Sequence, residues 1–352
     1  MTTAHKTLET LSRRFGVLSS DLNYLIHYDS DRNIAYFETP KVACTSIKKY
    51  MQDKVFGAPQ EFEIKGQVHD RAASPIRPLL ERSPEEVIAV LSGRVRRFSF
   101  VRNPYSRILS GYLDKIVTNQ WERDRHLPTL GFERNDTPSF LAFLEALARI
   151  PEGARDIHFA MQSRLLLAGD VGYEFIGSFE RFDEDFARLK AIFYQDNTDD
   201  NYATFGKHHA SDANDKISAH YGAAECAIVK DLYGPDFRVF GYSTDIQKTS
   251  EPPQFPDHSS RRGLGNLLTR LRLPTFNPID PEGFLRVIEN EMERGKMDIM
   301  QTTALMLFAA ETAGDAQAQI LHRRAIAVLR DKGFPTRAAD EEVRFTKRFN
   351  QS

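Results

Sequence analysis

Cysteine is nearly absent from this sequence: Cys44 and Cys226 are the two cysteines in a chain of 352 residues. Two thiols can form at most one disulfide, which excludes a small secreted fold held together by a disulfide framework. We expect both cysteines to be reduced thiols, as is usual in cytosolic proteins.

Long apolar runs are lacking as well. No stretch approaches the roughly 18 apolar residues that a membrane-spanning helix requires. The N-terminal stretch MTTAHKTLETLSRRF is polar and has no apolar core of the kind found in signal peptides. We therefore expect no transmembrane segment and a soluble protein in the cytoplasm.

The chain also has no large excess of charge of either sign. Lys and Arg number 47 against 49 Asp and Glu, so the formal net charge is −2. This balance does not favour a nucleic-acid partner, and any bound anion must be held by local basic groups. With 41% hydrophobic residues, the chain has the composition of an ordinary globular protein with one sizeable core and an appendage.

Strand-like and helix-like stretches alternate in the first 250 residues. We predict strands at 33–39, 96–101 and 173–179, each followed by a helix-like stretch. The helical period is clearest after the second strand, where Ile108, Tyr112 and Ile116 recur four residues apart. Such alternation predicts an α/β fold with a mainly parallel sheet, in which ligands bind beyond the carboxyl ends of the strands.

Prolines interrupt this pattern between residues 250 and 281, where they remove backbone donors and disfavour helix. We therefore predict a ligand-binding domain at 1–250, a proline-rich linker at 251–280 and a helical C-terminal extension at 281–352, with individual helices around 284–292, 300–310 and 316–329. Self-association into a homo-oligomer through these helices is one hypothesis for the extension.

The first strand–helix junction, PKVACTS at 40–46, has the chemistry of an anion site. A helix N-terminus offers free N–H groups and a positive dipole end, and Lys41, Thr45 and Ser46 add an ammonium and two hydroxyls. The glycines of the nucleoside-triphosphate loop G-x-x-x-x-G-K-[ST] are missing. The alternative interpretation is that Thr45 and Ser46 cap the helix and Lys41 is a solvated surface charge.

The second junction, FSFVRNPYSRILSGYLDK at 98–115, repeats the arrangement. Arg102 ends the strand, and Arg107 and Ser110 lie on the following helix. A guanidinium matches the geometry of a phosphate better than an ammonium does. Two anion-ready junctions indicate a ligand with two separated anionic groups.

Together these motifs resemble the paired nucleotide-binding motifs of sulfotransferases that use 3′-phosphoadenosine 5′-phosphosulfate (PAPS), in particular the chondroitin- and dermatan-type branch that modifies carbohydrates. The segments HFAMQSRLL, YEFIGSFERFDEDF and VKDLYGPDFRVFGY continue the resemblance in the same order, over about residues 30–243.

The resemblance implies a P-loop-like three-layer α/β sandwich and PAPS as co-substrate. It implies transfer of a sulfuryl group to an acceptor hydroxyl, which we expect to belong to a carbohydrate, with no metal. Arg102 and Ser110 would hold the 3′-phosphate. The 5′-phosphosulfate would be held by Pro40, Lys41, Val42, Ala43, Cys44, Thr45 and Ser46.

Three residues are predicted to be catalytic. Lys41 is the candidate for stabilising the leaving oxygen, and His69 and His158 are the candidate bases, because a neutral imidazole accepts a proton near pH 7. Asp70 and Glu180 are acidic alternatives for the base.

Two other function classes remain open from the sequence. A P-loop-type kinase would use ATP and magnesium on a similar fold, but the glycines of its loop are missing. A non-enzymatic scaffold would combine a degenerate nucleotide domain with a partner-binding helical extension. The joint presence of Lys41, Arg102 and Ser110 argues against degeneration.

Overall fold

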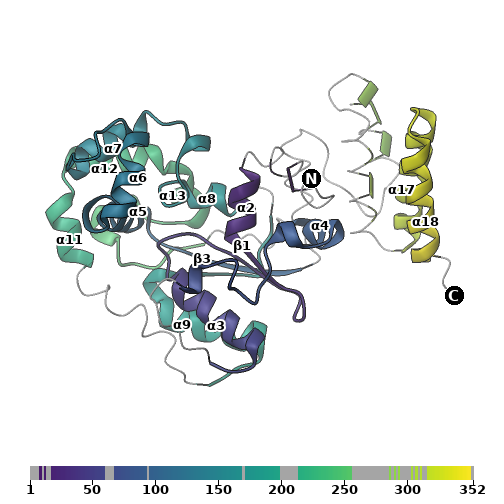
Figure 1. The fold of residues 1–352 in the computed structure, drawn as a ribbon, viewed down its shortest axis with the longest axis horizontal. Coiled ribbons are helices and arrows are strands. Elements are labelled where there is room, and N and C mark those ends of the chain that lie inside the picture. Colours follow the sequence, from purple (N-terminus) through teal and green to yellow (C-terminus); the bar gives the residue numbers. More distant parts are fainter. Residues whose placement is uncertain are drawn as a thin grey trace. The chain divides into compact units, whose positions relative to one another are not determined.

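The computed structural model describes residues 17–59, 67–92, 95–168, 171–198, 213–255 and 315–349, with isolated pieces at 8–9, 12, 285–286, 289–290, 292–293, 303, 306–307 and 310. By their contacts the residues divide into two compact units, Met1–Ser260 and Arg261–Ser352 (Figure 1). Most of the predicted proline-rich linker, residues 256–280, lies outside the described residues.

A four-stranded sheet forms the centre of the first unit. Its strands, in their order across the sheet, are β1 (Ile26–Asp29), β2 (Ile34–Phe37), β3 (Arg96–Val101) and β4 (Phe175–Ser178). β1 and β2 form an antiparallel hairpin, whereas the β2–β3 and β3–β4 pairs are parallel. The predicted α/β fold with a mainly parallel sheet is confirmed. Strand β1 was not predicted.

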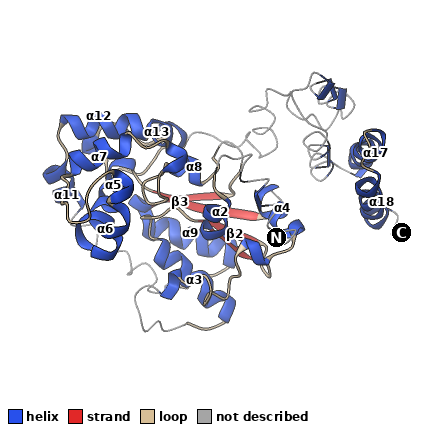
Figure 2. Cartoon of the chain, turned by 45° about the horizontal axis from the view of Figure 1, so that its top comes forward, coloured by secondary structure: helices blue, strands red, loops and turns tan. Residues whose placement is uncertain are grey.

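Helices cover both faces of this sheet (Figure 2), as the alternation of side chains along a strand requires. On one face, Tyr36 and Phe98 pack with apolar side chains of α3 (Cys44–Phe56) and α9 (Phe182–Tyr194). On the other face, Ala35 and Phe37 of β2 join a larger cluster with α4 (Pro84–Ser92) and α5 (Pro104–Tyr112).

The remaining helices of the first unit are short. The α-helices are α2 (Ser19–Leu25), α6 (Gln120–His126), α7 (Phe140–Ala148), α8 (Gln162–Leu165), α11 (Ala213–His220), α12 (Ala223–Leu232) and α13 (Gly234–Phe240). The 3₁₀ turns are η1 (Gln67–His69), η2 (Leu79–Glu81), η4 (Pro128–Leu130), η5 (Glu152–Ala154), η6 (Phe179–Arg181) and η8 (Ile246–Lys248). A π-helix, η3 (Leu113–Thr118), follows α5 directly.

The second unit contains a helical hairpin made of α17 (Asp315–Asp331) and α18 (Pro335–Phe349). Gly333 between them has φ 87°, a left-handed conformation that glycine adopts without strain. Buried His322 of α17 pairs with Glu341 of α18 at 3.2 Å. Helix α17 matches the helix predicted around 316–329, whereas no separate helix was predicted at α18. The all-helical character of the whole extension stays a prediction.

No helix among the described residues combines the length and apolar character needed to cross a bilayer.

Candidate active site

The backbone of the first junction adopts a strained conformation without glycine. Lys41 has φ 71° and Ala43 has φ 53°, whereas Val42 between them keeps a negative φ. A left-handed conformation costs a non-glycine residue about 1–2 kcal/mol. Left-handed residues that alternate with residues of negative φ can turn successive N–H groups toward one side, as in anion-binding backbone concavities.

Two arginines from the second junction hold this loop in place. Arg107 is fully buried and donates from Nε to the carbonyl oxygen of Pro40 at 3.0 Å and from Nη1 to that of Ala160 at 2.7 Å. Arg102 donates from Nη1 to the carbonyl oxygen of Lys41 at 3.3 Å. The two predicted anion sites are therefore in direct contact, although about 60 residues separate them in sequence.

Helix α3 begins without a side-chain cap. Its N-cap residue is Ala43, so Thr45 and Ser46 lie in the first turn and do not cap the helix. The N–H groups of Ser46 and Ile47 donate to the carbonyl oxygen of Ala43. Because no side chain caps the helix, the N–H groups of Cys44 and Thr45 and the helix dipole are available to an anion. Burial raises the pKa of the Cys44 thiol to about 12, which keeps it protonated and makes it a poor nucleophile.

His69 from η1 has both ring nitrogens occupied. Nε2 lies 3.1 Å from Oγ1 of Thr45, and Nδ1 lies 2.6 Å from Nζ of Lys48. Since an ammonium can only donate, Nδ1 accepts and Nε2 carries the proton. Lys48 is buried and also pairs at 3.0 Å with Glu38, which pairs at 2.8 Å with His27. Burial, followed by the charge of Lys48, lowers the pKa of His69 to about 4.

Arg102 lies at the carboxyl end of β3 and is 7% exposed. Its Nε donates to Oγ of Ser106 at 2.9 Å, and its guanidinium stacks 4.1 Å from the centre of the Phe179 ring. Ser106 and Ser110 follow at intervals of four residues, so the three side chains share one face of the chain entering α5. Ser110 is partly exposed, and its hydroxyl makes no hydrogen bond to any described residue.

His158 lies in the loop between η5 and α8, where Asp156 orients its ring. Nδ1 of His158 is 2.6 Å from Oδ1 of Asp156. Because a carboxylate only accepts, Nδ1 carries the proton and Nε2 keeps its lone pair. Nε2 makes no hydrogen bond to a described residue. Burial lowers the pKa of His158, and the hydrogen bond to Asp156 partly raises it again.

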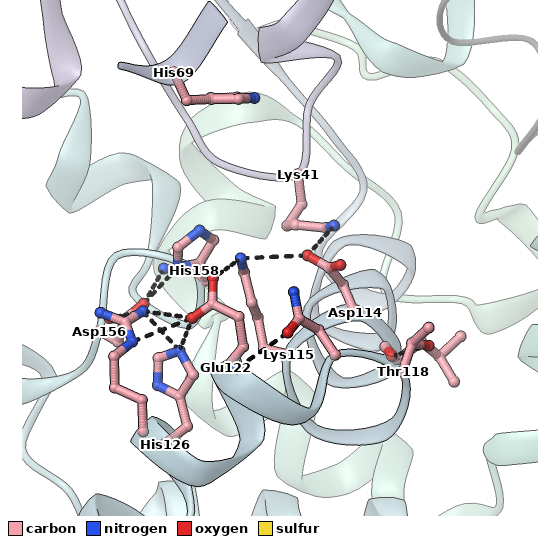
Figure 3. Close-up of polar contacts among 12 residues, drawn as sticks. Lys41, His69, Asp114, Lys115, Thr118, Glu122, His126, Asp156 and His158 are labelled. Atoms are coloured by element: carbon pink, nitrogen blue, oxygen red, sulfur yellow. Dashed lines mark hydrogen bonds and ion pairs between the residues drawn. The ribbon is translucent and has the colours of Figure 1, made fainter. Parts of the chain in front are cut away.

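A continuous series of ion pairs joins the first loop to this histidine (Figure 3). Nζ of Lys41 lies 2.9 Å from Oδ2 of Asp114, and the same oxygen is 3.5 Å from Nζ of Lys115. Lys115 also pairs with Glu122. In full, the series runs through Lys41, Asp114, Lys115, Glu122, Arg125, Asp156 and His158.

A sequence profile described as the sulfotransferase family matches residues 25–243, which is more than half of the chain. The chain belongs to the sulfotransferase family. The residues that form both junctions, and the series of ion pairs from Lys41 to His158, all lie inside the matched region.

Two curated relatives of this sulfotransferase-family chain carry carbohydrate sulfotransferase names. Carbohydrate sulfotransferase 12 of Mus musculus is 24% identical over 270 residues, covering 63% of this chain and 60% of the relative. Carbohydrate sulfotransferase 9 of Homo sapiens is 23% identical over 263 residues, covering 67% and 58%. The chain thus spans less than two thirds of the length of either relative. No solved structure matches the chain. The resemblance seen in the motifs is confirmed.

The two acidic alternatives for the base occupy different settings. Glu180 accepts from the backbone N–H of Asn103 at 2.7 Å and from the Tyr242 hydroxyl at 2.8 Å, so it holds the loop after β3. Burial raises the pKa of Glu180 to about 7. Asp70 is exposed and accepts from the backbone N–H of Ala72 at 2.9 Å, which closes a local turn.

Among the described residues, two groups of three have donor atoms close enough to share a metal ion: Glu38, Cys44 and His69, and His126, Asp156 and His158. Lys48 pairs with both Glu38 and His69 in the first group. In the second group, Arg125 lies 3.0 Å from Nε2 of His126 and 3.7 Å from Asp156. A lysine or arginine side chain therefore already contacts members of each group.

Sequence reasoning did not identify the charged residues that connect the site. Asp114 and Lys115 end the motif SGYLDK, but the helical period does not distinguish them from solvated surface charges. Glu122 and Asp156 come from separate segments, and folding alone brings them together. Ser106 could have been found from its position midway between Arg102 and Ser110.

Proposed function

We propose that this protein transfers the sulfuryl group of PAPS to a hydroxyl group of an acceptor, and that the acceptor is a carbohydrate. The observation that carries the proposal is the hydrogen bond from Arg102 to the carbonyl oxygen of Lys41. It brings the two strand–helix junctions with anion-binding chemistry into direct contact. A ligand with two anionic groups can occupy both at once. The names of the two curated relatives support a carbohydrate acceptor.

The residues fit such a donor. The left-handed residues Lys41 and Ala43 and the uncapped start of α3 provide backbone N–H groups for a phosphosulfate. A guanidinium has five N–H donors, and the bonds of Arg102 to Ser106 and Lys41 use two of them. The remaining donors and the Ser110 hydroxyl, which has no hydrogen bond to a described residue, are suited to a 3′-phosphate.

PAPS supplies the sulfuryl group: the acceptor oxygen bonds to sulfur, the bond from sulfur to the bridging oxygen breaks, and that oxygen leaves with the electron pair on 3′-phosphoadenosine 5′-phosphate (PAP). The ammonium of Lys41 has three N–H donors, of which Asp114 takes one, and it stabilises the growing negative charge of the leaving oxygen. By analogy with phosphoryl transfer, positioning and charge stabilisation do most of the catalytic work.

We assign the base to His158, because no described residue bonds to its Nε2, which can accept the acceptor proton while Asp156 holds the tautomer. The partners of His69 support a different role, since its protonated Nε2 faces Thr45 and orients the first turn of α3. For His69 to act as the base, the hydrogen bond from Lys48 to its Nδ1 would first have to break.

Calorimetric titration with PAP, 5′-AMP and ATP–magnesium tests this function. We expect PAP to bind much more tightly than 5′-AMP, because Arg102 and Ser110 bind the 3′-phosphate. Arg102→Ala should weaken PAP binding by roughly 10- to 100-fold, as the loss of charge-assisted hydrogen bonds predicts, and weaken 5′-AMP binding much less. Exposed Arg188→Ala on α9 is the matched control. A preference for ATP–magnesium would indicate a kinase, and binding of none of the three would indicate a scaffold.

A further inference from the structure

The end of α5 has a rare geometry. The helix continues without interruption into the π-helix Leu113–Thr118, and the N–H of Asn119 donates to the carbonyl oxygen of Asp114, five residues earlier, at 3.2 Å. π-Helices account for well under 1% of residues, and single π-turns are frequent at functional sites. Because a π-turn holds more residues than an α-turn, Asp114 and Lys115 leave the register of α5.

This geometry brings a second ammonium beside the first loop. Asp114 lies between Lys41 at 2.9 Å and Lys115 at 3.5 Å, and Lys115 also pairs with Glu122 from α6. Lys115 is 12% exposed, so its charge is largely withdrawn from water but still reachable. Two of its three N–H donors face Asp114 and Glu122, which leaves one for a ligand.

The ammonium of Lys115 lies within electrostatic reach of all three residues predicted to be catalytic. Its positive charge contributes to lowering the pKa of Lys41, of His69 and of His158. A cation so close to the leaving-group lysine and to both candidate bases lies near the position of the transferring group.

We propose that Lys115 is a further catalytic residue, whose ammonium donates a hydrogen bond to a non-bridging oxygen of the sulfuryl group during transfer, while Asp114 positions Lys41 and Lys115 side by side. This inference rests on the proposed function. The bonds made and broken at sulfur are those given above: Lys115 remains protonated, the leaving oxygen keeps its electron pair beside Lys41, and the acceptor proton goes to the base.

Comparison of PAPS with PAP isolates this contact, because PAP lacks the sulfuryl group. In calorimetric titrations of the full chain, Lys115→Met should weaken PAPS binding about tenfold and leave PAP binding unchanged, as expected for loss of one charge-assisted hydrogen bond. Lys230→Ala, an exposed lysine on α12, is the control and should bind both nucleotides as the parent does.

Glu122→Gln separates this role from a purely structural one. It removes one ion pair of Lys115 but keeps the ammonium, so the PAPS-to-PAP affinity ratio of the parent should persist. If Lys115→Met weakens both nucleotides equally or neither, or if Glu122→Gln reproduces its selective loss, Lys115 does not contact the sulfuryl group. If the parent itself binds neither PAPS nor PAP, the proposed function falls, and the inference falls with it.

Discussion

At the scale of single residues, the two candidate bases differ through their partners. His69 faces a cation at Nδ1 and a hydroxyl at Nε2, whereas His158 faces a carboxylate at Nδ1 and has no hydrogen bond from a described residue at Nε2. Burial favours the neutral form of both imidazoles. The same residue type is therefore fixed in opposite tautomers, and one of these leaves a nitrogen able to accept a proton.

Titration of His158 tests this assignment. Burial is the largest influence and lowers its pKa, so it should titrate below 6.5, the ordinary value. Asp156 is the main group that raises the pKa of His158, so Asp156→Asn should move the titration to still lower pH. The imidazole signal can be followed by NMR and assigned with His158→Gln. A higher pKa in Asp156→Asn would contradict the proposed pairing.

From the sequence, the residue types of the two predicted nucleotide-binding loops could be predicted, but not the ion pairs that join these loops to the rest of the site. Lys41 and Arg102 were found because they stand where a strand ends and a helix begins, and the role of Ser110 came from the family resemblance. Asp114, Lys115, Glu122 and Asp156 were not found, because a charged side chain on a helix or loop looks the same in sequence whether it faces water or a neighbour. Their roles follow from long-range contacts.

At the scale of elements, periodicity predicted three of the four strands. β2, β3 and β4 lie within the predicted segments, because each ends in a polar turn followed by a helical period. β1 was missed because it has only four residues and follows α2 directly, so no turn residue marks where the strand begins. The change from α- to π-helix after Tyr112 was also missed, since the apolar spacing continues to Ile116.

Gly177 allows β4 to pack closely against the Phe100 ring of β3, because it has no side chain. A Cβ atom at Gly177 would lie 2.3 Å from Cε1 of the fully buried Phe100 ring, with which it pairs across the sheet. Gly177→Ala should therefore destabilise the protein by about 1–3 kcal/mol through overpacking. Urea unfolding measures this. Gly153→Ala, where a Cβ would meet nothing within 4 Å, is the control. Equal stability of the two variants would show that Phe100 can move.

At the scale of the whole molecule, the described chain consists of two units with different sequence character. All residues assigned to the site lie in Met1–Ser260, and so does the whole region matched by the sulfotransferase profile. The described α17 and α18 of the second unit pack on each other through Ile326, Leu329 and Ala338. Helix α18 escaped prediction because charged residues dominate its sequence, PTRAADEEVRFTKRF.

The division predicts that the donor site does not need the second unit. A chain ending at Ser260 should unfold cooperatively and bind PAP with the affinity of the full chain, measured by calorimetry. Light scattering of both chains tests whether the C-terminal helices mediate self-association, which would make the longer chain alone oligomeric. A folded but non-binding shorter chain would show that the second unit contributes to the site.

The left-handed residues of the first loop also affect the rate at which PAPS binds. The strain at Lys41 and Ala43, and the fixing of the loop by Arg102 and Arg107, are already present in the folded chain. The entropy of ordering the loop is therefore lost on folding and not again at each turnover. Donor association should then proceed at the rate of encounter, with exchange of PAP for PAPS governed by how fast the spent nucleotide departs.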